Sequence, residues 1–114
     1  MNAGKLVVYP VDDLPKAKSL FNRFLGVKPY VDEGYYVGFK VGDLEIGLDP
    51  NGHKQGVTGP LVYYDVDDIK ASLKTLMEAG ATSVQATRDV GGGLLVASVK
   101  DPDGNIIALR QFSK

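Results

Sequence analysis

Two short apolar segments, each followed by an aspartate pair and an amphipathic stretch, dominate the hydrophobic pattern of the chain. Residues 5–11 and 60–66 are rich in Val, Leu and Tyr, which is typical of buried or half-buried strands. Apolar residues then recur at helical spacing over 14–25, and more loosely over 69–79. Each apolar segment is therefore predicted to be a strand that leads into a helix with one buried face.

The two segments are copies of one unit, 55 residues apart. Residues 6–14 and 61–69 share Leu6/Leu61, Val7/Val62, Tyr9/Tyr64, Val11/Val66, Asp12/Asp67 and Asp13/Asp68. Coincidence between two helix starts is the alternative, because Asp is a common N-cap residue, but the match extends back into the strand. Asp13 and Asp68 are predicted to cap the two helices, and Gly26 and Gly80 to end them in a left-handed conformation.

Three further extended segments follow each predicted helix. They are predicted at 28–31, 35–41 and 44–48 in the first half, and at 83–87, 94–100 and 106–112 in the second. Each half is thus predicted to be βαβββ, and the fold class α+β. A single domain over 1–114 would hold module 1 at 5–48, a connector at 49–60 and module 2 at 61–112, with the modules pairing within one chain or across two.

Three short motifs stand in a fixed order: Val11-Asp12-Asp13-Leu14 opens the first helix, Phe24-Leu25-Gly26 closes it, and Asp101-Pro102-Asp103-Gly104-Asn105 precedes the last strand. With the duplication, they resemble the vicinal oxygen chelate superfamily of glyoxalases, bleomycin resistance proteins and extradiol dioxygenases. The resemblance covers nearly the whole chain. It implies modules whose strands form an open, barrel-like sheet with helices on the convex side and a ligand cleft on the concave side.

The metal-ligand positions implied by this resemblance do not carry metal-binding side chains. In metal-dependent members each module supplies a ligand from its first and its last strand, and these positions fall on Leu6, Gly47, Leu61 and Ala108. None offers a donor atom for a divalent cation. Glu45 lies two residues before Gly47 on the same strand face, but a single carboxylate would not hold a metal without partners. The sequence therefore predicts no metal and no cofactor.

The alternation of side chains along a strand predicts which residues share the cleft face. They are Leu6, Val8, Pro10, Glu45, Gly47, Asp49, Leu61, Tyr63, Asp65, Ile106, Ala108 and Arg110. The opposite and more apolar set should lie beneath the helices: Val7, Tyr9, Val11, Leu44, Ile46, Leu48, Val62, Tyr64, Val66, Ile107 and Leu109. A one-residue slip in register would exchange the two sets.

Several polar residues have both a functional and a structural interpretation. Tyr63, Glu45, Asp65 and Arg110 are the predicted polar anchors of a small-molecule pocket, although Glu45 and Arg110 could instead form an ion pair between strands. Tyr35 and Tyr36 could supply an aromatic wall, but one of two consecutive strand residues must face away.

Three loop features suggest chemistry but fit structural explanations better. His53, the only histidine, lies in the glycine-rich connector without an oriented partner in the sequence, so a solvated loop residue is predicted. The 101–105 motif resembles a calcium loop but lacks its closing glutamate, which favours a β-turn. Gly91-Gly92-Gly93 does not match a phosphate-binding loop and is predicted to bend a hairpin, with a mobile lid as the functional alternative.

The amino-acid composition limits the classes of partner and the kinds of site that the chain is predicted to have. Thirteen basic and fourteen acidic side chains give a formal charge of -1, which disfavours nucleic acid as a partner. The absence of cysteine removes disulfides, thiolate metal sites and cysteine nucleophiles. No signal-peptide pattern or membrane-length apolar run is present, so no membrane partner and a cytoplasmic location are predicted.

The leading functional hypothesis is a metal-free small-molecule-binding protein, antibiotic- or metabolite-binding like the bleomycin resistance proteins, with homodimerisation implied by the resemblance. One alternative is an enzyme, a glyoxalase-like lyase or isomerase or a dioxygenase relative. It would either chelate a metal through Glu45 and other side chains, or act without a metal through Tyr63, Glu45 or Arg110. Another is a regulatory module that binds a protein partner. The sequence assigns no catalytic residue.

Overall fold

The computed structural model describes residues 5–113 of the chain, which form two compact units. The first unit is Lys5–Leu61, and the second begins at Val62. Each contains one helix and four strands in the order βαβββ, so the predicted α+β class and repeated order are confirmed. No helix in residues 5–113 is long and apolar enough to cross a membrane.

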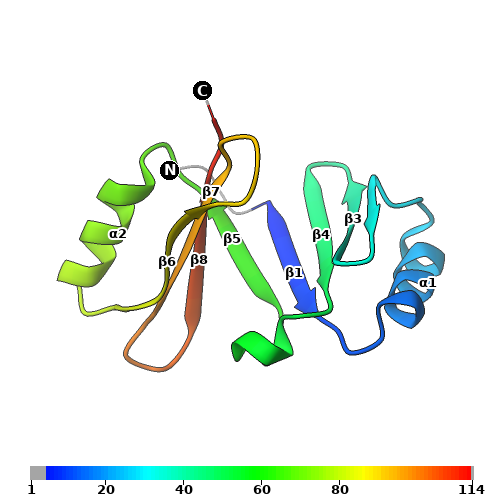
Figure 1. The fold of residues 1–114 in the computed structure, drawn as a ribbon, viewed down its shortest axis with the longest axis horizontal. Helices are drawn as coiled ribbons and strands as arrows, with labels where there is room; N and C mark the ends of the chain where they lie inside the picture. Colours follow the sequence, from blue (N-terminus) through cyan, green and yellow to red (C-terminus); the bar gives the residue numbers. More distant parts are fainter. Residues whose placement is uncertain (1–4, 114) are drawn as a thin grey trace. The chain divides into compact units, whose positions relative to one another are not determined.

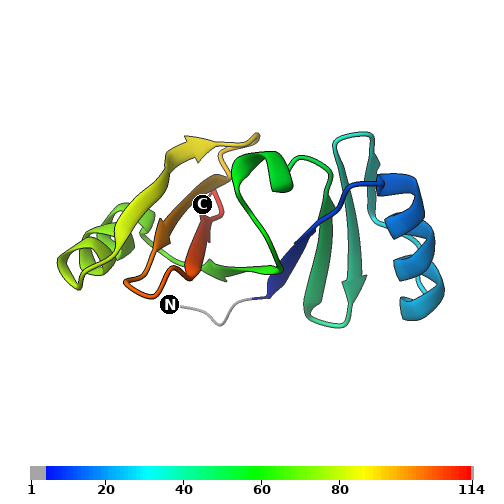
Figure 2. The same cartoon turned by 90° about the horizontal axis from the view of Figure 1, so that it is seen from below.

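The first unit has one four-stranded mixed sheet with a helix on one face (Figure 1). Its elements are β1 (Leu6–Pro10), α1 (Leu14–Leu25), β2 (Val31–Glu33), β3 (Tyr36–Val41), β4 (Leu44–Asp49) and the short 3-10 helix η1 (His53–Gln55). The strand order is β2-β3-β4-β1, and β1 runs parallel to β4 while the other pairs are antiparallel. In Figure 2, α1 runs alongside β3 and β4, which it contacts.

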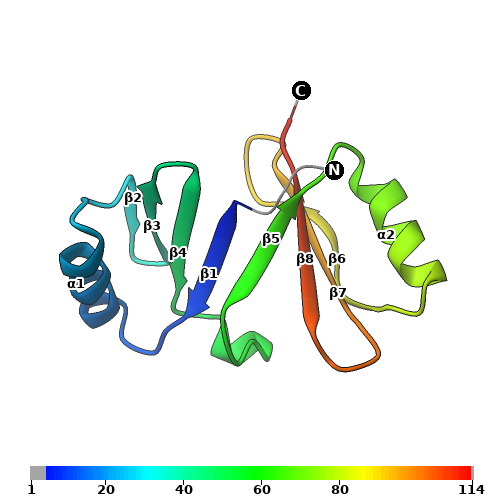
Figure 3. The ribbon, with the colours of Figure 1, turned by 180° about the vertical axis from the view of Figure 1, so that it is seen from behind.

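The second unit repeats this arrangement. Its elements are β5 (Leu61–Asp65), α2 (Ile69–Glu78), β6 (Thr82–Asp89), β7 (Leu95–Lys100) and β8 (Ile106–Gln111). The order is β5-β8-β7-β6, with β5 parallel to β8, and α2 contacts β6, β7 and β8 (Figure 3). In both units the first and last strands are parallel, so a tight turn cannot join them, and the connection between them includes the helix.

The two predicted helix N-caps are confirmed. The Asp13 side chain accepts a hydrogen bond from the Lys16 amide at 3.0 Å, and Asp68 accepts one from the Ala71 amide at 3.1 Å. Each bond satisfies an amide that has no partner within the helix, which fixes where the helix begins. At the other end, Gly26 caps α1 with φ of 72°, as predicted, whereas the C-cap of α2 is Ala79 and Gly80 follows it with φ of 111°.

One predicted strand is misplaced. The sequence pattern predicts a strand at 28–31, whereas β2 spans Val31–Glu33. Pro29 has no amide hydrogen to donate, and the ladder with β3 begins only where Val31 lies opposite Gly38. The other strand boundaries differ from the predicted ones by one or two residues.

The helix-facing side chains form a separate core in each unit. Val37, Phe39, Ile46 and Leu48 are buried beneath α1. Val66, Ile69, Ala97 and Leu109 are buried in the second unit, with Leu73 and Leu76 of α2 packed against them. Most of the residues predicted to lie beneath the helices are in these cores. Val7, Leu44 and Val62 are the exceptions. Val7 is half-buried outside the cores, and Leu44 and Val62 are exposed near the start of their strands.

Candidate functional site

The face of the first unit's sheet opposite α1 carries the predicted cleft residues of module 1. In the parallel β1–β4 pair, Leu6 is the register partner of Glu45, Val8 of Gly47 and Pro10 of Asp49. Register partners in adjacent strands project to the same side of a sheet. Ile46 and Leu48 face α1, so the predicted residues of β4 project to the other face.

The second unit places its predicted residues in the same way. In the β5–β8 pair, Tyr63 is the partner of Ala108, and Asp65 is the partner of Arg110. Ala108 is fully buried, and Leu109 between it and Arg110 packs in the core on the helix side. Within each unit, therefore, the predicted residues lie side by side on one face.

Two glycines form a flat floor on this face of the first unit, and a tyrosine covers each of them. Gly38 and Gly47 are register partners on β3 and β4. A Cβ atom at Gly38 would lie 3.1 Å from Cε1 of Tyr30, and one at Gly47 would lie only 2.0 Å from the hydroxyl oxygen of Tyr36. A side chain at residue 47 would therefore collide with the Tyr36 ring. Glycine at this position is required for the phenol to lie where it does.

Glu45 is the acidic group of the same surface. The Tyr30 hydroxyl donates a hydrogen bond to its Oε1 at 2.5 Å, and the Glu45 residue is half-buried. Lys40, the register partner of Glu45 on β3, places its Nζ 4.6 Å from the centre of the Tyr30 ring, within cation-π range. We call this surface, made of Tyr30, Tyr36, Gly38, Glu45 and Gly47, the tyrosine face.

Arg110 is the basic group of the second unit's face. Its guanidinium donates from Nε to Oδ1 of Asp65 and from Nη2 to Oδ2 at 3.3 Å, which makes a two-point ion pair across β5 and β8. Arg110 is only 5% exposed, so burial of its charge needs such a counter-ion. The guanidinium also lies 4.7 Å from the centre of the Phe112 ring. The predicted anchors Asp65 and Arg110 thus act on each other.

The residues at the family's metal positions do not fit a divalent metal ion. Leu6 and Leu61 have hydrocarbon side chains, Ala108 has a methyl group, and Gly47 has none. Within the described residues 5–113, no group of three His, Cys, Asp or Glu side chains is placed to hold a metal. The donor atoms of the tyrosine face are phenol hydroxyls and one carboxylate.

His53 has a partner that the sequence pattern did not predict. Its Nδ1 lies 2.8 Å from Oδ1 of Asp12, which joins η1 to the loop before α1. The two residues are distant in sequence, so only the fold brings them together, and His53 is exposed to solvent as predicted. Both side chains remain largely exposed to solvent.

The other two loop features have structural roles. Asp101 accepts hydrogen bonds from the Asp103 and Asn105 amides at 2.9 and 2.8 Å, so the 101–105 motif is a turn between β7 and β8, as predicted. These bonds, with the Asn105 side-chain amide as the largest contributor, lower the pKa of the Asp101 carboxyl below its ordinary value. Residues 91–93 link β6 and β7, and all three glycines have positive φ, which confirms the hairpin bend.

Sequence reasoning missed Tyr30 and Lys40 as neighbours of Glu45. Tyr30 lies in the segment whose strand was misplaced, and no periodic pattern indicates that its ring folds over β3. The available signal was the pair of glycines at 38 and 47, because a glycine inside a strand often marks a close approach. Of the two candidate wall residues, Tyr36 lies on this face, while Tyr35 precedes β3 and is exposed.

Comparison with known proteins gives the family. The family model described as "Glyoxalase/Bleomycin resistance protein/Dioxygenase superfamily" matches residues 5–109, almost the whole chain. The chain belongs to this superfamily. None of the curated proteins compared with the chain matches it.

Solved structures share the superfamily fold with the chain. A superfamily member from Vibrio splendidus 12B01 has a TM-score of 0.72 and 16% identity, over 93% of this chain and 96% of its own. Methylmalonyl-CoA epimerase from Mycobacterium tuberculosis has a TM-score of 0.72 and 18% identity, over 98% and 89%. A protein named NAD-dependent benzaldehyde dehydrogenase, from Legionella pneumophila, has a TM-score of 0.76 and 15% identity, over 95% and 98%. The names differ while the fold is shared, so this likeness concerns the fold alone.

Proposed function

We propose that this superfamily member binds a small organic molecule without a metal ion, as the antibiotic-binding members do. The observation that carries the proposal is the position of Tyr36. Its hydroxyl oxygen occupies the space that a metal-ligating side chain at residue 47 would need, 2.0 Å from the Cβ position. The tyrosine face therefore has a phenol where metal-dependent relatives have a metal ligand.

The chemistry of the tyrosine face suits an organic ligand. Aromatic rings of Tyr30 and Tyr36 lie over the glycine floor, and the aliphatic side chains of Leu6 and Val8 of β1 lie on the same side, where both are buried. Pockets for small molecules combine such apolar walls with a few polar groups that fix orientation. Glu45 and the phenol hydroxyls supply these groups on the first unit, and Tyr63 is a polar residue on the corresponding face of the second unit.

Metal analysis combined with ligand screening tests this proposal. Protein purified without chelators should contain less than stoichiometric divalent metal after dialysis, and a metabolite and antibiotic library should yield ligands that raise the melting temperature equally with and without EDTA. Tyr36→Phe should weaken the binding of such ligands, whereas Tyr35→Phe, an exposed neighbour, should not. A stoichiometric metal ion that survives dialysis would overturn the proposal. A broad library without hits would favour the regulatory, protein-binding alternative instead.

A second candidate is an enzyme that moves a proton, and the Tyr30–Glu45 hydrogen bond favours it. A half-buried carboxylate held at 2.5 Å by a phenol is oriented as a general base would be. The epimerase from Mycobacterium tuberculosis shows that the fold accommodates an isomerase. This candidate corresponds to the lyase or isomerase alternative drawn from the sequence.

Activity assays separate the two candidates. Turnover of a 2-oxoaldehyde hemithioacetal, or epimerisation of methylmalonyl-CoA, would support the enzyme if Glu45→Gln abolishes it and Glu33→Gln, on the neighbouring β2, does not. If the protein only binds a ligand, neither substrate should be converted, even at high protein concentration. Added divalent metal should make no difference to that result.

A further inference from the structure

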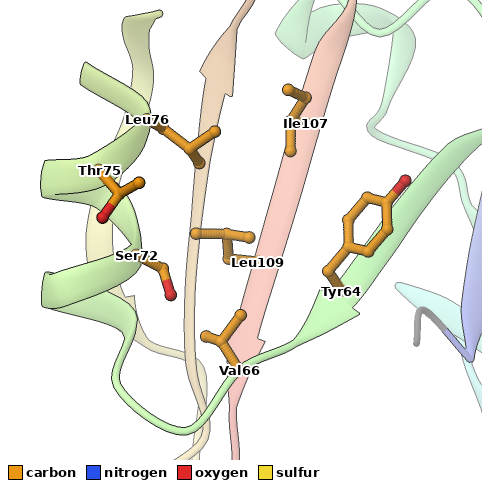
Figure 4. Close-up of a pocket in the computed structure, with 7 residues that line it drawn as sticks. All are labelled: Tyr64, Val66, Ser72, Thr75, Leu76, Ile107 and Leu109. Carbon is orange, nitrogen blue, oxygen red and sulfur yellow. The ribbon is translucent and has the colours of Figure 1, made fainter. Parts of the chain in front are cut away.

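A pocket of about 450 Å³ opens in the second unit between α2 and the sheet, on the side opposite the predicted cleft face. Figure 4 shows Ser72 and Leu76 projecting from α2 toward Leu109 and Ile107 of β8, with the Tyr64 ring of β5 at one side. The pocket belongs entirely to the second unit. Neither the superfamily's metal positions nor the tyrosine face includes any of these residues.

The internal repeat explains why this space is open. Leu76 of α2 corresponds to Phe21 of α1, because both helices begin immediately after the matched caps Asp68 and Asp13. In the first unit the Phe21 ring lies 5.2 Å from the Tyr9 ring and 6.5 Å from the Phe39 ring. An aromatic side chain therefore fills, in the first unit, the place that lies open in the second.

Other side chains in the second core are also smaller than their counterparts in the first. Phe39 and Ile46 are register partners on β3 and β4, as Val99 and Ile107 are on β7 and β8, so Val99 stands where the first unit has Phe39. In addition, α1 ends with Leu25, whereas α2 ends at Glu78, two residues short of the matching position. The second unit thus has smaller side chains and a shorter helix around this pocket and its core, although Tyr64 retains the ring that corresponds to Tyr9.

The lining of the pocket gives the chemistry of its ligand. Val66, Leu76, Ile107 and Leu109 are aliphatic, and an open apolar pocket of this kind suits an aromatic ring. Ser72 contributes a hydroxyl where the first unit has Ala17. The hydroxyl of Thr75 donates a hydrogen bond to the Ala71 carbonyl oxygen at 3.1 Å, so its hydrogen is not available to a ligand. The ligand thus needs one aromatic ring and one hydrogen-bonding group.

We propose that the pocket beneath α2 is a second binding site, for a small phenol-like molecule whose ring takes the place that Phe21 fills in the first unit. The site is independent of the proposed ligand site on the tyrosine face. Binding there would stabilise the second unit, because a ligand that fills an underpacked core binds only the folded state.

Methyl NMR of the full chain, with toluene and 4-methylphenol as probes, tests the proposal. Both probes should shift the methyl signals of Leu76, Ile107 and Leu109 saturably, and those of Ile46 and Leu48 in the first unit should not move. The 4-methylphenol should bind more tightly than toluene, and Ser72→Ala should remove that difference. Shifts that do not saturate, or that affect both cores alike, would overturn the proposal.

Filling the pocket provides the decisive variant. Leu76→Phe should weaken probe binding at least about tenfold, because the introduced ring occupies the ligand's space. Met77→Phe is the matched control, since Met77 follows Leu76 but is exposed, and it should bind as the parent does. If Leu76→Phe fails to fold, Ser72→Leu serves the same purpose. The proposed site would be refuted if Leu76→Phe and Met77→Phe bound the probes equally well. It would also be refuted if self-association of the chain displaced the probes.

Discussion

At the scale of single residues, the two units show how much one aromatic side chain changes a repeated core. Phe21 stacks against Tyr9 and Phe39, while its counterpart Leu76 borders a pocket. The same sequence pattern of helical spacing predicts a buried position in both helices. Side-chain volume, which the pattern does not measure, decides whether the space around that position is filled.

Phe21→Leu should reproduce the underpacking of the second unit in the first. We expect a loss of about 1 kcal/mol in the free energy of unfolding, because the substitution removes ring contacts and leaves a cavity. Phe24→Leu is the matched control on the same helix, since Phe24 is 79% exposed, and it should change stability by less than about 0.5 kcal/mol. Urea denaturation of both variants measures the difference. Equal losses of unfolding free energy in the two variants would show that Phe21 does not pack as described.

Gly47→Ala should displace the Tyr36 ring. A Cβ atom 2.0 Å from the phenol oxygen cannot be accommodated, so the side chain must move and the variant should lose about 1 kcal/mol of stability. In a Tyr36→Ala background the same change should cost much less. Gly34→Ala is the control, since no atom lies within 4 Å of its Cβ position. An additive double-mutant cycle would be inconsistent with a direct clash.

At the scale of elements, the turn between β7 and β8 shows local chemistry that the sequence predicts well. Asp101 bonds to the amides of Asp103 and Asn105, and Gly104 provides the positive φ of 90° that the turn requires. All of these contacts span at most four residues. Short motifs of this kind, like the helix caps, are determined locally and could be predicted with their partners.

The carboxylate of Asp101 should make the turn sensitive to acid. Its pKa is lowered from the ordinary value of 3.8, chiefly by the Asn105 side-chain amide, so its contribution to stability is present above pH 3.8 and is lost as the pH falls through the lower value in the folded chain. Carboxyl NMR titration should give Asp101 a midpoint below 3.8 in the native chain. Asn105→Ala should raise that midpoint. A native midpoint at or above 3.8 would contradict the hydrogen bonding of the turn.

At the scale of the whole molecule, the repeated βαβββ order and the family match show which superfamily the chain belongs to. They do not identify its ligand. We propose that it works as a homodimer, as its resemblance to the superfamily implies. Sedimentation equilibrium should give twice the monomer mass at micromolar concentration, independent of EDTA. A monomer at all concentrations tested would refute the proposal.

The sequence by itself determined the repeat, the helix caps, the strand faces and the loss of metal-ligating side chains at Leu6, Gly47, Leu61 and Ala108. These features depend on periodicity, short-range hydrogen bonds or residue identity, all of which are readable along the chain. Only the tertiary structure decided which distant side chains meet: Tyr30 with Glu45, His53 with Asp12, and Tyr36 over Gly47. The physical reason is that ring orientation and core volume depend on neighbours brought together by folding, and a linear pattern contains no information about their distances.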